Sequence, residues 1–179
     1  LEPWPGRLCL KSAQKANINV LTRVVDYGGI FHGTMKPDHV FREGDHRAYR
    51  PEGWVESGLE RVEKMRPILD KYGLSEIQFA SLWNLAHTPV KSVVPTFIQE
   101  AGEEALTIEE LVRDFASMPV ENPLTLEEVE EIAGIGDNTG CMLLKGASKR
   151  HEESLRPDEW PMKPELMEVA SRHGLGDDW

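Results

Sequence analysis

Cysteine is scarce in this sequence, and long hydrophobic runs are missing altogether. The two cysteines among 179 residues, Cys9 and Cys141, are far apart and lack the spacing of metal ligands. A disulfide between them is one alternative, but two free thiols in a reducing cytosol are the simpler expectation. No stretch approaches the roughly 18 apolar residues of a membrane span, and the N-terminus does not resemble a secretion signal. We therefore expect a cytoplasmic protein with no membrane partner.

Basic residues are in the minority. The 20 Lys and Arg are outnumbered by 31 Asp and Glu, which gives a formal net charge of -11. Such a chain repels a phosphate backbone unless its basic residues gather on one face, so nucleic acid is not an expected partner. Hydrophobic residues make up 40% and charged residues 28% of the chain, which is ordinary for a folded domain that buries a core.

Apolar spacing and capping patterns predict several helices. Residues 7–16 are typical of the end of a helix. Between residues 54 and 72 apolar side chains recur at three- and four-residue steps, which predicts a helix with one buried face. Pro67 favours a kink in this helix, and Gly73 ends it. Three further helices are predicted to begin at capping boxes: Ser75 with Gln78, Thr107 with Glu110, and Thr125 with Glu128.

Two segments have the character of parallel strands. Residues 18–25 are largely apolar and β-branched, which predicts a buried strand that stops at the turn with Gly28 and Gly29. Residues 92–95 predict a second strand, and residues 34–52 predict a long irregular loop. Strands separated by helices imply parallel crossovers. Because two strands do not make a covered sheet, we expect further polypeptide to complete it.

Five groups of residues, in this chain order, carry a resemblance to one family of enzymes: 20–25 with 28–33, 45–47, 74–83, 92–95 and 123–128. The family is the aldo-keto reductases. In the same order, the groups resemble the seventh barrel strand and its loop, the Asp-x-Arg of that loop, the Ser-x-x-Gln-x-Ala-Leu-x-Trp helix, the eighth strand, and the closing Pro-Leu-Ser/Thr. The resemblance implies an α/β fold in which residues 1–133 are the C-terminal portion of a (β/α)8 TIM barrel. This portion is incomplete on its own, since a whole barrel usually needs about 250 residues. Residues 134–179 would form an irregular C-terminal extension that packs on the surface.

The resemblance also implies a site for NADP or NAD at the carboxyl ends of the strands. Gly28 and Gly29 would let backbone N–H groups approach a pyrophosphate, although a tight turn alone also explains the pair. Arg23 falls where the family packs a residue against the nicotinamide ring, and a strand-end charge paired with a neighbouring acid is the alternative. The implied cofactor-binding residues are Arg23, Val24, Gly28, Gly29, Pro95, Thr96, Glu110 and Asp114.

Three of these residues depart from the family pattern. Thr96 replaces the glycine that follows the proline, Glu110 stands where NADP-binding members carry an arginine for the 2′-phosphate, and Asp114 replaces an adenine-contacting asparagine. A carboxylate repels a phosphate but accepts a hydrogen bond from a ribose 2′-hydroxyl. The sequence therefore predicts either a preference for NADH or a loop that no longer holds a cofactor.

A second departure is the lack of a catalytic apparatus. The family takes its catalytic Asp, Tyr, Lys and His from the first four strands, and no segment here resembles those strands. We assign no catalytic residue and expect no turnover by this chain alone. The expected function is part of an NAD(P)H-dependent aldo-keto reductase acting on a small carbonyl or alcohol substrate. Its partner would be the remainder of the barrel, in the same chain or another. The alternative is a non-catalytic binding or scaffold protein derived from that fold.

A glycine pair late in the chain offers a different hypothesis. Residues 131–140 resemble the Gly-Ile-Gly hairpin of helix-hairpin-helix DNA-binding modules, in which backbone N–H groups bind a phosphate. Several acidic residues flank the pair and would face that phosphate. A glycine stop at the end of a helix is therefore the favoured interpretation.

Three histidines are spaced seven residues apart, at His32, His39 and His46. Such a set raises the hypothesis of a metal site, or of a base with its orienting carboxylate. Pro37 and Gly44 break any helix that would align them. We therefore expect separate loop histidines.

Overall fold

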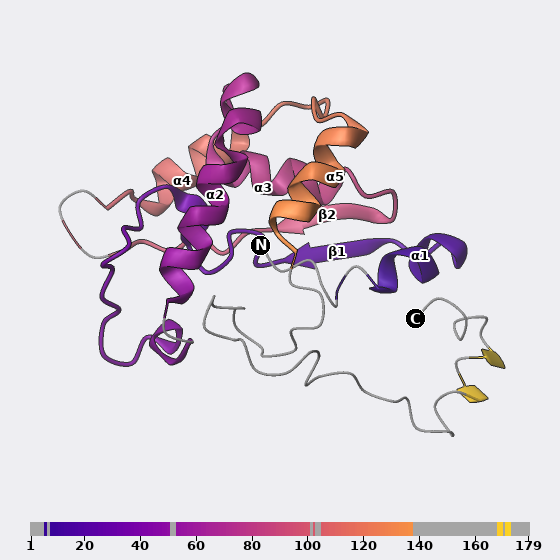
Figure 1. Ribbon diagram of the computed structural model, residues 1–179, viewed down its shortest axis with the longest axis horizontal. Helices are drawn as coiled ribbons and strands as arrows, with labels where there is room; N and C mark the ends of the chain where they lie inside the picture. Colours follow the sequence, from indigo (N-terminus) through magenta and orange to yellow (C-terminus); the bar gives the residue numbers. More distant parts are fainter. Residues whose placement is uncertain are drawn as a thin grey trace.

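Helices and strands alternate along the chain in the computed structural model, which describes residues 6, 8–50, 53–100, 102, 105–137, 168, 169, 171 and 172 (Figure 1). In chain order the elements are α1 (Leu8–Lys15), β1 (Val20–Arg23), the 3-10 helices η1 (Ile30–His32) and η2 (His46–Tyr49), α2 (Trp54–Lys71), α3 (Glu76–Leu85), β2 (Val90–Val94), α4 (Ile108–Ala116) and α5 (Leu126–Ile135). The predicted mixed α/β class is confirmed. With two strands, the described residues do not themselves form a barrel.

Capping boxes begin α3, α4 and α5, as the sequence predicts. In each box the hydroxyl of the N-cap residue accepts a hydrogen bond from a backbone N–H three residues later, and the side chain at that later position accepts from the N-cap N–H. Two donors that a helix start leaves unpaired are thereby satisfied, which is typically worth about 1 kcal/mol per cap. The N-cap residues are Ser75, Thr107 and Thr125.

The long helix α2 packs its apolar face against η1 and α5. The helix runs through Pro67, which is exposed, and ends at Lys71; Tyr72 is its C-cap, and Gly73 follows in a left-handed conformation. Gly58 lies where α2 meets η1, and a Cβ at this position would overlap the side-chain end of Ile30. The glycine therefore permits the close approach of the helix to the loop that follows β1.

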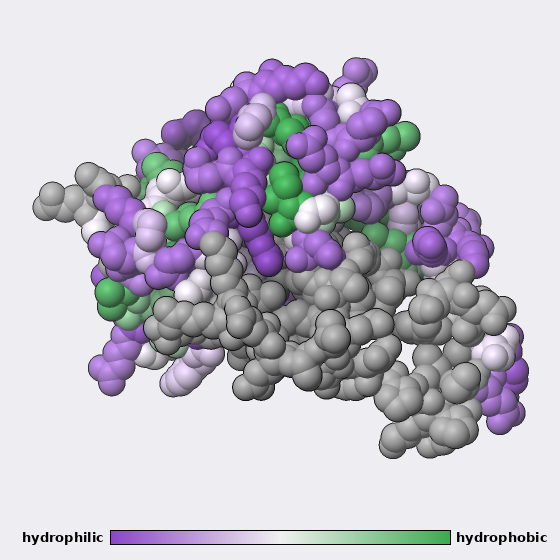
Figure 2. Space-filling view, in the orientation of Figure 1, coloured by the Kyte–Doolittle hydropathy of each residue, from purple (hydrophilic) through white to green (hydrophobic). Residues whose placement is uncertain are grey.

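The two strands form a parallel pair in which Leu21 lies opposite Ser92 and Arg23 opposite Val94. Helices α2, α3 and α5 lie on one side of this pair (Figure 1), and α3 contacts β2 directly. The core lies among these helices and η1, and its largest fully buried side chains include Phe79, Ile30, Ile77, Leu82 and Val62. In the view of Figure 2, the surface over the helices is mainly hydrophilic, with small hydrophobic areas between them.

The opposite face of the sheet is exposed in the described part of the chain, so the prediction of a strand buried on both faces is wrong there. Leu21 is 59% exposed, and Arg23, Ser92 and Val94 on the same face are exposed too. The predicted strand over residues 18–25 is also shorter, because Val24 has a φ of 58° and cannot continue β1. The apolar pattern predicted burial on both faces, whereas the described helices cover one.

The segment from Gly134 onward is described only in part. Helix α5 continues to Ile135 and has Gly136 as its C-cap, so the Gly-Ile-Gly sequence lies at a helix end. The rest of that motif, Cys141 and most of the predicted extension lie outside the described residues. Within that extension, residues 168, 169, 171 and 172 are helical. None of the described helices combines the length and apolar composition that crossing a bilayer requires.

Candidate functional site

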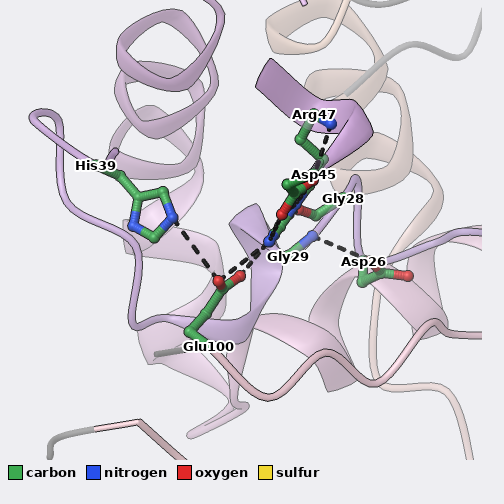
Figure 3. A network of polar contacts seen from close by, with 7 residues as sticks. All are labelled: Asp26, Gly28, Gly29, His39, Asp45, Arg47 and Glu100. Atoms are coloured by element: carbon green, nitrogen blue, oxygen red, sulfur yellow. Dashed lines mark hydrogen bonds and ion pairs between the residues drawn. The ribbon is translucent and has the colours of Figure 1, made fainter. Parts of the chain in front are cut away.

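The buried carboxylate of Asp26 joins the ends of the two strands. Asp26 follows β1 and is fully buried. Its Oδ1 accepts a hydrogen bond from the backbone N–H of Thr96, just after β2, at 2.6 Å. Its Oδ2 accepts one from the N–H of Gly29 at 3.1 Å, and this second bond is drawn in Figure 3. One side chain therefore holds the two loops at the carboxyl edge of the sheet.

The turn of Gly28 and Gly29 needs glycine for both conformation and space. The two residues have φ angles of 66° and 94°, in the left-handed region. A Cβ on Gly28 would lie 3.2 Å from Cη2 of Trp54, and one on Gly29 would lie 3.1 Å from Nη1 of Arg47. Both glycines are buried. Because the Gly29 N–H already donates to Asp26, it is not available to a phosphate in this structure.

Arg47 is the centre of a buried ionic network (Figure 3). The side chain is 5% exposed, and its Nη1 donates to the carbonyl of Gly28 at 3.0 Å and to Oε1 of Glu100 at 2.5 Å. Its Nη2 donates to Oδ2 of Asp45 at 2.7 Å. The network thus joins the glycine turn, the long loop after it and the segment after β2.

Hydrogen bonding stabilises the charged forms of Asp45 and Arg47. The hydrogen bond from the Arg47 side chain lowers the pKa of Asp45 to about 2. Burial opposes the charged form of Arg47, but hydrogen bonds to Asp45 and Glu100 outweigh this and raise the pKa of the guanidinium. Charge-assisted, forked hydrogen bonds of this kind are among the strongest in proteins. The Asp-x-Arg pattern of the sequence therefore acts as one buried unit.

His39 and Phe41 extend the network along the long loop. Nε2 of His39 lies 3.7 Å from Oε2 of Glu100, and its ring meets Phe41 edge to face at 4.7 Å between centroids. The Arg47 guanidinium lies 4.7 Å above the Phe41 ring. The loop is irregular, as predicted, apart from the 3-10 helix η2 near its end. Ionic and aromatic contacts fix the conformation of this loop, where a strand or helix would use a regular series of backbone hydrogen bonds.

His32 lies beside this network but has no hydrogen-bond partner. It is 8% exposed, and neither ring nitrogen has a partner within the described part of the chain. Burial lowers its pKa, and Arg47 acts in the same direction, while Asp26, Glu100 and the Thr96 backbone oppose the shift. His46, by contrast, is exposed at the start of η2. No group of three or more His, Cys, Asp or Glu within the described residues is placed to hold a metal ion.

The lowered pKa of His32 predicts a stability that depends on pH. The unfolded chain binds a proton at the ordinary pKa of 6.5, whereas the folded chain resists protonation to a lower pH. This contribution is complete above pH 6.5 and is lost progressively as the pH falls below it. Urea unfolding at pH 7.5 and 5.5 should show this loss in the wild type and a smaller loss in His32→Gln. An equal loss in both proteins would assign the pH dependence to other groups.

Two of the predicted cofactor residues lie at the end of β1. Arg23 is exposed on the open face of the sheet, opposite Val94. Val24 follows it in the left-handed region and donates its N–H to the Val94 carbonyl at 2.9 Å. A β-branched residue in this conformation costs roughly 1–2 kcal/mol. Strain of this kind at the end of a strand is common at functional sites.

Pro95 and Thr96 directly follow β2, and the Thr96 N–H is the second donor to Asp26. The structure therefore brings together six predicted residues at one edge of the sheet: Arg23, Val24, Gly28, Gly29, Pro95 and Thr96.

Glu110 and Asp114 lie apart on α4. The Glu110 carboxylate accepts hydrogen bonds from the N–H and hydroxyl of Thr107 at the start of the helix, and these bonds lower its pKa. Asp114 accepts from the Ser75 hydroxyl and from the side-chain amide of Gln78, which docks α4 onto the start of α3. Among the described contacts, no hydrogen bond or ion pair joins either carboxylate to the Arg47 network.

Sequence reasoning missed the three acidic and basic groups that organise the site, although two of them carry a local signal in the sequence. Asp26 directly precedes the turn at a strand end, where functional groups of parallel α/β proteins gather. Arg47 belongs to the Asp-x-Arg pattern, which was noticed only for its resemblance. Glu100 has no local pattern, because its partner lies 53 residues away.

Comparison with known proteins adds no relative. No protein-family model matches this sequence, and no curated protein or solved structure matches it significantly. A functional assignment therefore has to come from the residues and geometry of the chain.

Proposed function

We propose that this chain is the C-terminal portion of a (β/α)8-barrel oxidoreductase of the aldo-keto reductase type, supplying loops that bind NAD or NADP. The observation that carries the proposal is the unfinished sheet. Two parallel strands are paired with each other, each has one unpaired edge among the described residues, and one face is open.

Such a sheet is physically incomplete. Parallel sheets occur almost only with both faces covered, whereas the described helices cover one face of this pair. In a barrel the helices form the outer ring and the opposite face points inward, where side chains from other strands fill it. The exposed Leu21 and Val94 lie on the face that would point inward. We therefore propose that further strands, in the same or another chain, pair with β1 and β2.

The carboxyl edge of the sheet is the proposed place for the dinucleotide. Arg23 is exposed there at the end of the open face, which suits a planar side chain that stacks on a ring. The Gly29 N–H fits a phosphate less well, because Asp26 already accepts from it. When bound, the dinucleotide would exchange hydride with a carbonyl or alcohol substrate. The residues of this chain would bind and orient it, and none of them is assigned a catalytic step.

Cofactor preference is proposed to favour NADH. Glu110 is exposed, and its lowered pKa keeps it ionised near neutrality. If the adenosine of the dinucleotide reaches α4, this charge repels a 2′-phosphate and accepts a hydrogen bond from a 2′-hydroxyl. The preference would then follow from one carboxylate.

Titration of the 179-residue chain with NADH and NADPH tests this function. We expect NADH to quench tryptophan fluorescence at lower concentration than NADPH, and Arg23→Leu to weaken both. The matched control is Arg113→Leu, which removes an exposed charge from α4. No response to either dinucleotide would contradict the proposed function.

The alternative function is a non-catalytic binding or scaffold protein derived from the same fold. One observation favours it: the turn that would meet the pyrophosphate has its Gly29 N–H bonded internally. Failure of both dinucleotides to bind, with the fold intact by circular dichroism, would support this alternative.

A further inference from the structure

A hollow of about 200 Å³ lies between the first turn of α2 and the loop before it. Arg47, Arg50, His39, Phe41 and Trp54 contribute to its wall. The wall is therefore cationic and aromatic, although the chain as a whole is strongly acidic.

Arg50 is a cation of this hollow that forms no ion pair among the contacts of the described residues. Its guanidinium lies 4.2 Å above the ring of Trp54 and 5.5 Å from that of Tyr27. Its Nη1 is buried and has no hydrogen-bond partner within the described part of the chain. Arg47, in contrast, is balanced by Asp45 and Glu100. A buried donor of a half-buried guanidinium that lacks an acceptor is costly, so Arg50 is held in a position that an anion would stabilise.

The start of α2 supplies further donors. Gly53 is the N-cap and has no side chain with which to accept from the first turn of this 18-residue helix. Unpaired N–H groups and the helix dipole make such an end attractive to anions. Independently, Trp54 is 3% exposed and lines the hollow, and its indole Nε1 has no hydrogen-bond partner among the described residues. Glu56, exposed on the rim, is the acidic residue of this wall.

We propose that this hollow binds a phosphate-bearing ligand, with the Arg50 fork and the first turn of α2 as its donors. Arg50 presents planar donors that match phosphate oxygens. Phe41 and Trp54 provide apolar walls beside the anion. The proposal rests on these contacts alone and does not depend on the dinucleotide function.

Calorimetric titration of the full chain with inorganic pyrophosphate tests the site. We expect saturable binding that Arg50→Met weakens about 10- to 100-fold, as for loss of a charge-assisted hydrogen bond. Arg50→Lys should lose less, because it keeps the charge without the fork. Arg42→Met is the matched control, since Arg42 is exposed in the same loop and does not line the hollow. It should bind as the wild type does.

Thermal unfolding supplies a second readout, because a ligand of the folded state raises the unfolding temperature by mass action. Pyrophosphate should raise it for the wild type and Arg42→Met and not for Arg50→Met. Absence of binding to the wild type would overturn the proposal. Equal losses in Arg42→Met and Arg50→Met would overturn it too, since they would show general charge attraction.

Competition identifies the source of the phosphate. If NADH displaces pyrophosphate, the dinucleotide is the ligand of the hollow. If pyrophosphate binds and NADH neither binds nor competes, the site takes a separate phosphoryl ligand, and the dinucleotide function fails while this inference stands. If NADH binds and pyrophosphate does not, the inference fails and the dinucleotide function stands.

Discussion

Replacement of Arg47 by methionine is expected to lower the free energy of unfolding by about 3–5 kcal/mol. Arg47 is buried and donates to Asp45, Glu100 and the Gly28 carbonyl. Methionine approximates the volume of the side chain but removes the guanidinium donor from all three acceptors. Urea denaturation at neutral pH measures the loss directly.

Two variants show whether this loss comes from the network. Arg47→Lys keeps the charge but not the fork, so an intermediate loss is expected. Arg66 pairs with Glu63 and Glu76 at a site about one-third exposed, so Arg66→Met should cost no more than about 1 kcal/mol. If Arg47→Met lowers the free energy of unfolding as little as Arg66→Met does, the result would contradict a buried Arg47 network that stabilises the fold.

Replacement of Asp26 by alanine is expected to cost about 2–5 kcal/mol, because two backbone N–H groups each lose a charge-assisted hydrogen bond to the carboxylate. These are the N–H groups of Gly29 and Thr96. Hydrogen exchange gives a readout at the site itself: the amides of Gly29 and Thr96 should exchange faster in Asp26→Ala. The loops after the two strands would then no longer be held together.

The isosteric variant Asp26→Asn separates shape from hydrogen bonding. Its amide keeps one acceptor oxygen but turns a donor toward the second N–H, so we expect a loss of stability below that of alanine and faster exchange at one amide. Unchanged exchange at both amides in Asp26→Ala would be incompatible with the described hydrogen bonds.

Elements that depend on neighbouring residues were predictable from the sequence. The capping boxes at Ser75, Thr107 and Thr125 act over three residues, and the structure confirms all three. The stop at Gly73 is equally local. Strand bounds were less accurate: β2 begins at Val90 rather than residue 92.

The organisation of the site was not predictable in the same way. Arg47 meets Glu100 across 53 residues, and Asp26 meets Thr96 across 70. No spacing in the sequence records such a contact, because it follows from the parallel pairing of β1 with β2. His32 was expected to be an ordinary loop histidine, and only its burial distinguishes it from His46.

The open face of the sheet shows how a correct pattern can give a wrong local conclusion. The apolar run around Leu21 predicts a strand covered on both sides, as parallel strands usually are. Residues 20–23 do form the strand β1, but the described residues cover one face of the sheet. The pattern therefore supports the proposal of a larger sheet, in which the second cover comes from further strands.

Equilibrium unfolding of Leu21→Lys tests most directly whether this chain leaves that face uncovered. We expect a change within about 0.5 kcal/mol, as for a surface substitution. The matched control Leu82→Ala, at a buried leucine, should cost about 2–5 kcal/mol. A loss of several kcal/mol for Leu21→Lys, similar to that of Leu82→Ala, would show that the chain buries its own sheet and would contradict the proposed barrel portion.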